Sequence, residues 1–193
     1  MLSFFRKKKY PKFYKNYLES FKTKAPKRFE KTRFVVFDTE TTGLEVNSDK
    51  ILSIGAVAIK NGIIDVSDFF EIYLTQDKFN SDTVEIHGLL KDGNLKKYSE
   101  QEAIELFLNY IKNAVLVAHH AAFDITMINQ ALTHLKLPKL KNKTIDTGIL
   151  YKKLEGKQDG HFNLDKLCYE FNIPKHDRHT ASGDAYITAI LLL

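Results

Sequence analysis

The chain has 193 residues, of which 44% are apolar, and it carries 29 Lys and Arg against 24 Asp and Glu. This composition is typical of a globular protein with one core. A single cysteine, Cys168, excludes a disulfide framework, and no apolar run approaches the roughly 18 residues that span a bilayer. The first residues also lack the apolar stretch of a signal peptide. We therefore expect a cytoplasmic protein with no transmembrane segment.

The net charge of +5 conceals two regions of opposite sign. Residues 1–33 hold 12 basic and two acidic residues, whereas the rest of the chain holds 17 basic and 22 acidic residues. Because the basic charge is concentrated in one segment, the two parts call for separate interpretations. We predict a basic extension with a linker over residues 1–33 and a main domain over residues 34–193.

Aromatic and aliphatic residues recur in the extension at spacings of three and four: Tyr10, Phe13, Tyr14, Tyr17, Leu18 and Phe21. This spacing predicts an extra N-terminal amphipathic helix, with Pro11 in its first turn. The apolar stripe could pack on the main domain, or it could bind a protein partner or a membrane surface. The neighbouring lysines could contact phosphates or form a solvated face.

Strand patterns begin at residue 34 and then alternate with helix patterns. Residues 34–40 predict a buried strand, and the pair Asn61-Gly62 between two apolar runs predicts a hairpin. The first three strands should therefore form an antiparallel meander. Further strands are predicted at 114–119 and 144–147. We expect an α/β fold with a mixed five-stranded sheet flanked by helices.

Capping residues and apolar spacing predict the helices. Ser99 followed by Glu102 is the pattern of a capping box, and we expect Leu106 and Phe107 of this helix to face the core. Residues 123–136 also show helical spacing. Two more helices are predicted near the C-terminus, one capped by Asn163 and one starting near Thr180.

Four carboxylates and one histidine stand near the ends of these elements. Asp38 and Glu40 are two residues apart on the first strand, so their side chains share one face. Asp124 starts a helix, and Asp184 lies in the last helix, five residues after His179. Small residues around Asp184 allow that helix to approach the first strand. Such a convergence suits two Mg²⁺ or Mn²⁺ ions in phosphoryl chemistry.

Three motifs, DTETTGL, HHAAFD and HTASGD, occur in this order along the chain. They resemble the motifs of the DEDD 3′-5′ exonucleases, and the histidine spacing resembles the DEDDh branch. The closest resemblance is to the proofreading epsilon subunit of bacterial DNA polymerase III, over residues 34–193. It implies a ribonuclease H-like fold whose first three strands are antiparallel.

The resemblance also implies catalytic roles. Asp38 would bridge two metal ions, and Glu40 and Asp184 would complete the site of the nucleophile's ion. Asp124 would hold the second ion. His179 would accept a proton from the attacking water, as a neutral imidazole can near pH 7. The product would be nucleoside 5′-monophosphates.

Five positions are candidates for substrate contact: Thr41, Gly43, Leu44, His87 and Phe123. Gly43 gives the turn after the first strand the freedom to let a group approach closely, and Leu44 would wedge against the terminal base. For His87 the alternative is a buried, hydrogen-bonded histidine, and for Phe123 it is core packing rather than base stacking. We expect Asp146 to cap the following helix rather than to bind metal.

Three functions remain open from the sequence. The first is a metal-dependent exonuclease acting on single-stranded DNA 3′ ends, in proofreading or repair. The second is a ribonuclease that trims RNA 3′ ends, because recognition of the 2′-hydroxyl is not legible in one sequence. The third is an inactive nucleic-acid-binding module, which the presence of all five catalytic positions disfavours. Because the chain ends at Leu193, directly after the last helix, we expect a stand-alone or differently tethered enzyme.

Overall fold

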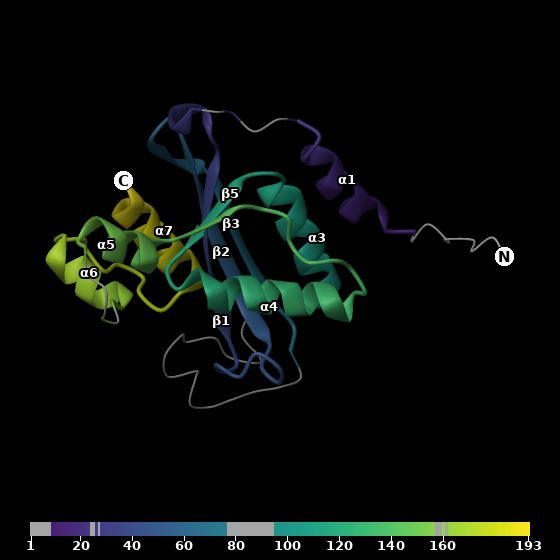
Figure 1. The fold of residues 1–193 in the computed structure, drawn as a ribbon. Coiled ribbons are helices and arrows are strands. Elements are labelled where there is room, and N and C mark those ends of the chain that lie inside the picture. The colour runs from purple at the N-terminus through teal and green to yellow at the C-terminus, as the bar shows by residue number, and fades with distance from the viewer. Residues whose placement is uncertain (1–8, 24–25, 27, 77–94, 157–159, 161) are drawn as a thin grey trace.

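The computed structural model describes residues 9–23, 26, 28–76, 95–156, 160 and 162–193. A mixed sheet lies at its centre (Figure 1). Its strands are β1 (Phe34–Thr41), β2 (Ile51–Lys60), β3 (Ile63–Leu74), β4 (Lys97–Tyr98), β5 (Val115–Ala118) and β6 (Thr144–Asp146). The helices are α1 (Lys12–Ser20), the 3-10 helix η1 (Phe29–Lys31), α3 (Glu100–Ile111), α4 (Ala121–His134), α5 (Thr147–Leu154), α6 (Leu164–Glu170) and α7 (Ala181–Leu192).

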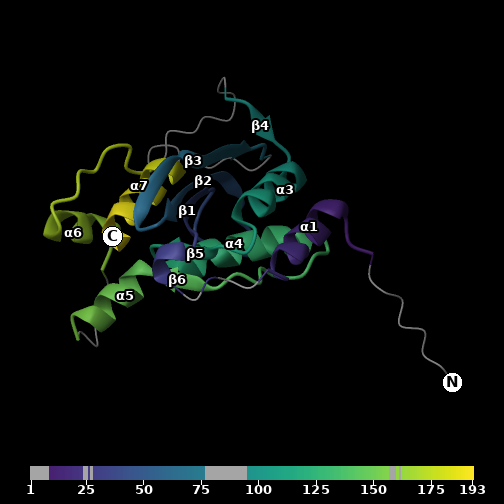
Figure 2. The same cartoon turned by 90° about the horizontal axis from the view of Figure 1, so that it is seen from above.

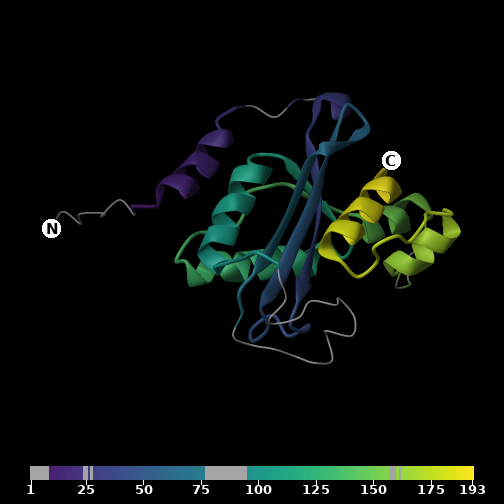
Figure 3. The ribbon, with the colours of Figure 1, turned by 180° about the vertical axis from the view of Figure 1, so that it is seen from behind.

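Helices cover both faces of this sheet. Helices α1, α3 and α4 lie on one face, and α7, with α5 and α6 beside it, lies on the other (Figures 2 and 3). The strand order is β4-β3-β2-β1-β5-β6, so β1 is an inner strand. A strand covered on both faces reads as a nearly continuous apolar run, which explains the sequence FVVF at the start of β1. The predicted α/β mixed sheet is confirmed.

The strand pairing confirms the predicted meander and adds one strand to it. Strands β1 and β2, and β2 and β3, pair antiparallel, and the turn between β2 and β3 has Asn61 at φ 54° and Gly62 at φ 73°. The expected number of five strands was one too few. The additional strand, β4, has two residues and pairs parallel with the end of β3. A strand of two residues is too short to show an alternation pattern.

Most of the expected helix starts are confirmed. Ser99 and Glu102 form the capping box of α3, Asn163 caps α6 and Asp146 caps α5 through the Ile149 N–H. The expectation for Leu106 was wrong: its side chain is 40% exposed, whereas Phe107 is fully buried. The buried positions of α3 are Ala103, Ile104, Phe107, Leu108 and Ile111, and Leu106 lies just outside the apolar stripe that they form. None of the helices in the described part of the chain is both long and apolar enough to cross a membrane.

Helix α1 packs on the main domain through its aromatic stripe. Phe13, Tyr14 and Tyr17 are buried in the same core as β1 and α3. The Tyr14 hydroxyl donates to the Pro138 carbonyl at 3.2 Å, and Tyr17 donates to Asn142 Oδ1 at 2.8 Å. Pro11 is the N-cap rather than a first-turn residue. Of the alternatives for the stripe, docking on the domain is the one observed, while the boundary between residues 33 and 34 stays a prediction.

Candidate active site

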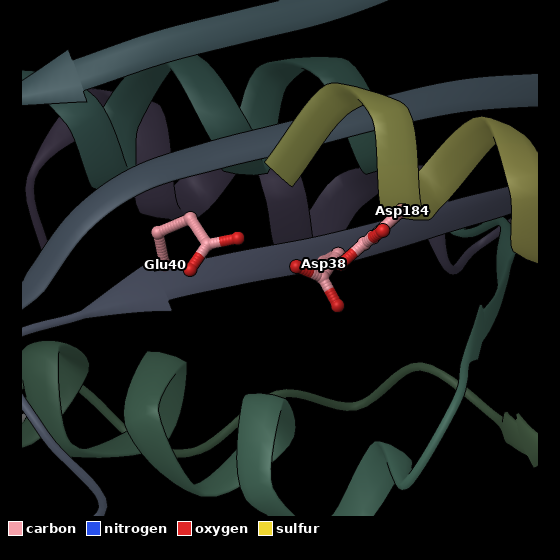
Figure 4. Close-up of side chains that lie close together, drawn as sticks. All are labelled: Asp38, Glu40 and Asp184. Atoms are coloured by element: carbon pink, nitrogen blue, oxygen red, sulfur yellow. The ribbon is translucent and has the colours of Figure 1, made fainter. Parts of the chain in front are cut away.

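Three of the predicted carboxylates meet on one face of β1. Asp38 and Glu40 project from this face, and Asp184 of α7 points toward them (Figure 4). Ligand oxygens of the three side chains lie within 4.8 Å of one another. Strand alternation explains the first pair, because residues two apart point to the same side.

A glycine on β2, Gly55, allows α7 to bring Asp184 close to Asp38 and Glu40. Gly55 is the partner of Asp38 in the antiparallel register. A Cβ atom at Gly55 would lie 2.2 Å from the Ser182 backbone nitrogen, so only glycine lets the first turn of α7 rest on the sheet at this point. The small residues of α7 predicted the close approach of this helix to β1. The part played by Gly55 was missed, although a glycine inside the strand run ILSIGAVAI is a visible signal.

The fourth carboxylate, Asp124, reaches β1 from the opposite helical layer. Strand β5 pairs with β1 only from Phe34 to Val36, so the later part of that edge of β1 is open. The Thr39 N–H and hydroxyl both donate to Asp124 Oδ1, at 3.0 and 2.7 Å. Asp124 is 3% exposed. Thr39, which the sequence analysis missed, thus orients this carboxylate at the open edge.

Burial and mutual repulsion make the four carboxylates hard to ionise together. Burial, followed by the charges of neighbouring acids, raises the pKa of Glu40 to about 7, and burial raises that of Asp124 to about 7. The pKa of Asp38 lies well above its usual value, because of burial and then of the charges of Asp124, Asp184 and Glu40. A cluster of this kind holds either protons or cations. Its donors are all carboxylate oxygens, which fits Mg²⁺ or Mn²⁺.

One side-chain cation of the protein lies within this cluster. Arg178 donates from Nη1 to Asp184 Oδ2, and from Nη2 to Asp165 Oδ2 at 3.0 Å. Burial raises the pKa of Asp184, while the charge of Arg178 opposes the increase. Arg178 therefore connects a candidate metal ligand to the start of α6. Sequence reasoning missed it, although it directly precedes His179.

His179 lies at the exposed rim of the site. Its backbone is left-handed, with φ 66°, and its N–H lies 3.4 Å from Asp184 Oδ1. The loop before it packs so closely on α7 that a Cβ at Gly183 would lie 2.0 Å from the Asp177 carbonyl oxygen. The ring is exposed to solvent. These contacts place His179 beside Asp184, and its role as a base stays a prediction.

The turn after β1 is held by an aspartate that the sequence analysis did not single out. Asp49 accepts hydrogen bonds from the Thr42 hydroxyl and the Glu45 N–H, both at 2.8 Å. A Cβ at Gly43 would lie 2.5 Å from Asp49 Oδ2. The group that approaches Gly43 is thus a side chain of the chain itself. Thr41 donates its hydroxyl proton to the Gly43 carbonyl at 2.7 Å, which also stabilises the turn.

The remaining candidates for substrate contact have different surroundings. Leu44 is 80% exposed at the tip of the turn, as a wedge residue should be. Phe123 is partly buried and packs against the main core, so core packing is at least part of its role. His87 lies outside the described residues. Substrate contact at all five positions stays a prediction.

The first histidine of the motif HHAAFD has a structural role. Burial is the main cause that lowers the pKa of His119 to about 4, so the ring is neutral near pH 7. Nε2 lies 2.8 Å from the Phe162 carbonyl and Nδ1 lies 2.9 Å from the Thr147 hydroxyl. Because a carbonyl only accepts, Nε2 carries the proton and Thr147 donates to Nδ1. His119 thus ties the end of β5 to the start of α5.

Comparison with known proteins agrees with this geometry. The family model of the RNase_T exonucleases matches residues 35–192. The chain belongs to the RNase_T exonuclease family. It is 32% identical to the DNA polymerase III subunit epsilon of Treponema pallidum over 160 residues, which cover 82% of this chain and 74% of that protein. The resemblance to epsilon is therefore confirmed. The match to an exonuclease family over most of the chain also confirms that the protein is an enzyme.

Two further matches show how much of larger proteins this family domain represents. The chain is 35% identical over 162 residues to the PolC-type DNA polymerase III of Halalkalibacterium halodurans, covering 83% of this chain and 11% of that protein. The chain thus spans about a tenth of such relatives. Among solved structures, E. coli exonuclease I in complex with a dA16 oligonucleotide matches with a TM-score of 0.69 at 15% identity, covering 83% of this chain and 40% of that chain.

A smaller solved structure matches over most of its length. The nuclease domain of 3′hExo, a DEDDh family member bound to rAMP, has a TM-score of 0.73 at 13% identity, with 85% of this chain and 91% of that chain covered. At this identity the match shows the fold alone. The predicted ribonuclease H-like architecture is confirmed.

Proposed function

We propose that the protein is a metal-dependent 3′-5′ exonuclease that hydrolyses single-stranded DNA ends to nucleoside 5′-monophosphates, in proofreading or repair. The observation that carries this proposal is the convergence of Asp38, Glu40 and Asp184 on one side of β1, with Asp124 at its open edge. The relative named epsilon and the exonuclease I complex with an oligonucleotide support DNA as the substrate.

The four carboxylates would have different roles in binding the ions. Asp38, which has acidic neighbours on both sides, would contact both of two Mg²⁺ or Mn²⁺ ions; Glu40 and Asp184 would hold one of them and Asp124 the other. Ions bound there would lower the pKa of the attacking water and stabilise the leaving 3′ oxygen. Thr39 orients Asp124, and Arg178 holds Asp184 in place and opposes the increase of its pKa. Asp124 and Asp184 are thus positioned before a substrate arrives, which reduces the reorganisation that the reaction requires.

His179 would act as the general base. A ring nitrogen of the neutral imidazole would accept the proton of the attacking water and release it to solvent, to which the ring is exposed. The left-handed backbone at His179 and the contact of its N–H with Asp184 support a fixed position beside the carboxylates. A location in the cytoplasm stays part of this proposal.

A second candidate is a ribonuclease that trims RNA 3′ ends. The observation that favours it is the 3′hExo domain, a match over most of its length that was solved with a ribonucleotide. Both candidates use the same carboxylates, so they differ only in how the sugar is recognised.

Digestion of matched DNA and RNA oligonucleotides by the purified protein tests both candidates. We expect stepwise shortening of the DNA strand from its 3′ end with Mg²⁺ or Mn²⁺, release of nucleoside 5′-monophosphates, and no reaction in excess chelator. Faster shortening of RNA would favour the ribonuclease. Degradation that resists the chelator, or release of 3′-monophosphates, would contradict both candidates.

A further inference from the structure

A second feature, outside the carboxylate site, joins α1 to the segment that follows α4. The Tyr17 hydroxyl accepts a hydrogen bond from the Lys141 N–H at 2.7 Å and donates one to Asn142, and Tyr14 bonds to Pro138. Figure 1 shows α1 beside α3, on the same side of the sheet as α4. Two segments more than 120 residues apart in the chain thus form one continuous surface.

The exposed lysines of these two segments include Lys12, Lys15, Lys136, Lys139 and Lys141. We call them the lysine surface. None of the five forms an ion pair with another residue in the described part of the chain. Two acids of the same helical layer are already engaged, since Glu19 pairs with Lys22 and Glu100 with His134. Five such charges favour a polyanionic partner.

A groove whose lining residues are mostly polar extends from Lys139, one member of the lysine surface, to Thr126; we call it the polar groove. It has a volume of about 380 Å³ and runs between the turn after β1 and the outer face of α4. Asn47 borders it on the turn, Thr126 and Gln130 on the helix, and Lys139 at the far end. Thr126 is two residues from Asp124 and faces the other side of α4, so a strand that follows the groove would pass around the start of this helix to reach the carboxylates. Amide and hydroxyl groups of this kind bind nucleic-acid backbones without selecting a sequence.

We propose that the lysine surface binds the upstream part of a single-stranded nucleic acid whose 3′ end lies at the carboxylates and whose backbone follows the polar groove. This inference rests on the proposed function for the direction of the strand. The reason for a separate surface is electrostatic: four carboxylates repel phosphates, so the attraction that brings a strand to the site comes from another part of the molecule.

The geometry sets a length threshold for this binding. Helix α4 has 14 residues and is therefore about 21 Å long. About six stacked nucleotides, or fewer extended ones, span this distance at 3.4 Å each. A trinucleotide should reach the carboxylates without touching the lysine surface, whereas a strand of about 12 nucleotides should contact both.

Binding in excess chelator tests the inference without requiring turnover. We would measure the fluorescence anisotropy of a labelled oligothymidylate of about 12 nucleotides with the full chain and with the variant Lys12→Gln, Lys15→Gln, Lys139→Gln, over a series of salt concentrations. Lys31→Gln, Lys153→Gln, Lys166→Gln is the matched control, because it removes equal charge from exposed positions that do not line the groove. Arginine at the three test positions should restore binding.

We expect the test variant to bind up to about 100-fold more weakly at 0.1 M salt, with a log-log salt slope smaller by about 2, since each single-strand phosphate contact contributes about 0.7. The control should bind like the original chain, and hydrolysis of a trinucleotide should be equal in all variants. Equal slopes for test and control, or lysine-dependent binding to anionic vesicles but not to the oligonucleotide, would overturn the inference. If the oligonucleotide binds through the lysines but the protein hydrolyses no substrate, the inference is supported and only the proposed function is contradicted.

Discussion

The carboxylate cluster at the end of β1 and the docking site of α1 differ in how their charged groups are placed. In the carboxylate cluster, Asp124 and Asp184 are buried, Asp38 and Glu40 are half-buried, and the pKa values of all four rise. At α1, the aromatic rings are buried and the lysines remain in water. Burial of aromatic rings stabilises the fold, whereas burial of like charges destabilises it until a cation binds. One part of the molecule, the carboxylate cluster, thus lowers stability until a cation binds, and another part, the aromatic side of α1, increases it.

Removal of one carboxylate should change activity more than any other substitution considered, and it tests the role of the carboxylate cluster. For Asp38→Asn we expect a loss of about 10³-fold or more in turnover, because metal ions contribute several kcal/mol to the transition state. The midpoint of thermal unfolding in chelator should stay equal or rise, because repulsion is relieved. Oligonucleotide digestion and calorimetry measure the two quantities, with Glu30→Gln as an exposed control. Turnover close to that of the original chain would exclude Asp38 as a ligand.

Removal of the His179 imidazole should lower the rate of hydrolysis less than removal of a carboxylate does. For His179→Ala we expect a rate lower by about 10² to 10⁴, as is typical of general acid-base catalysis, with Mn²⁺ affinity largely kept. Titration calorimetry with Mn²⁺ separates the two effects. A large decrease in affinity for the ion would instead identify His179 as a ligand.

On the α1 side, a single aromatic substitution should affect stability and leave the chemistry intact. Tyr14 is fully buried and bonded to Pro138, so Tyr14→Ala should cost about 3 kcal/mol of unfolding free energy, limited by the free energy of docking α1. Hydrolysis of a trinucleotide should not change. Asn16→Ala, on the exposed face of the same helix, is the control in denaturant titrations. An unchanged midpoint for Tyr14→Ala would mean that α1 does not stabilise the domain.

The raised pKa values predict how pH affects the chelated protein. Glu40 and Asp124 titrate near 7 in the fold and near their usual values of 4.5 and 3.8 when unfolded. Between about pH 4 and pH 7 the folded state therefore binds more protons, and its stability should fall as the pH rises through this window and level off above it. Thermal unfolding in chelator should show this slope, reduced in Glu40→Gln. A protein with the same slope after that substitution would contradict the raised pKa of Glu40.

The smallest expected effect concerns the turn that borders the site. Gly43→Ala would push a methyl group against Asp49 and should cost about 1 to 2 kcal/mol. Because the clash involves one side chain, Gly43→Ala combined with Asp49→Ala should cost less than the sum of the two single changes. Denaturant titrations of the three variants give this coupling. Strict additivity would show that Gly43 and Asp49 do not interact.

Local signals in the sequence were sufficient for several elements. The turn at Asn61-Gly62, the capping box at Ser99 and the cap at Asp146 depend on neighbours within a few residues, so they could be read without the fold. Leu106 shows where this reading fails, since periodicity did not decide which of two adjacent apolar residues faces the core. The two-residue strand β4 is defined only by its partner on β3.

By itself, the sequence determined which residues are candidates for the site and where they stand in the secondary structure: Asp38 and Glu40 on one strand, Asp124 at the start of a helix, and His179 and Asp184 near the end. The tertiary structure alone decided how these residues are supported. Gly55 admits α7, Thr39 orients Asp124, Asp49 holds the turn, and Arg178 binds Asp184. It also decided that α1 packs beside Lys139 and Lys141. The physical reason is that local propensities act over a few residues, whereas each of these supports is a contact whose existence depends on how strands, turns and helices pack.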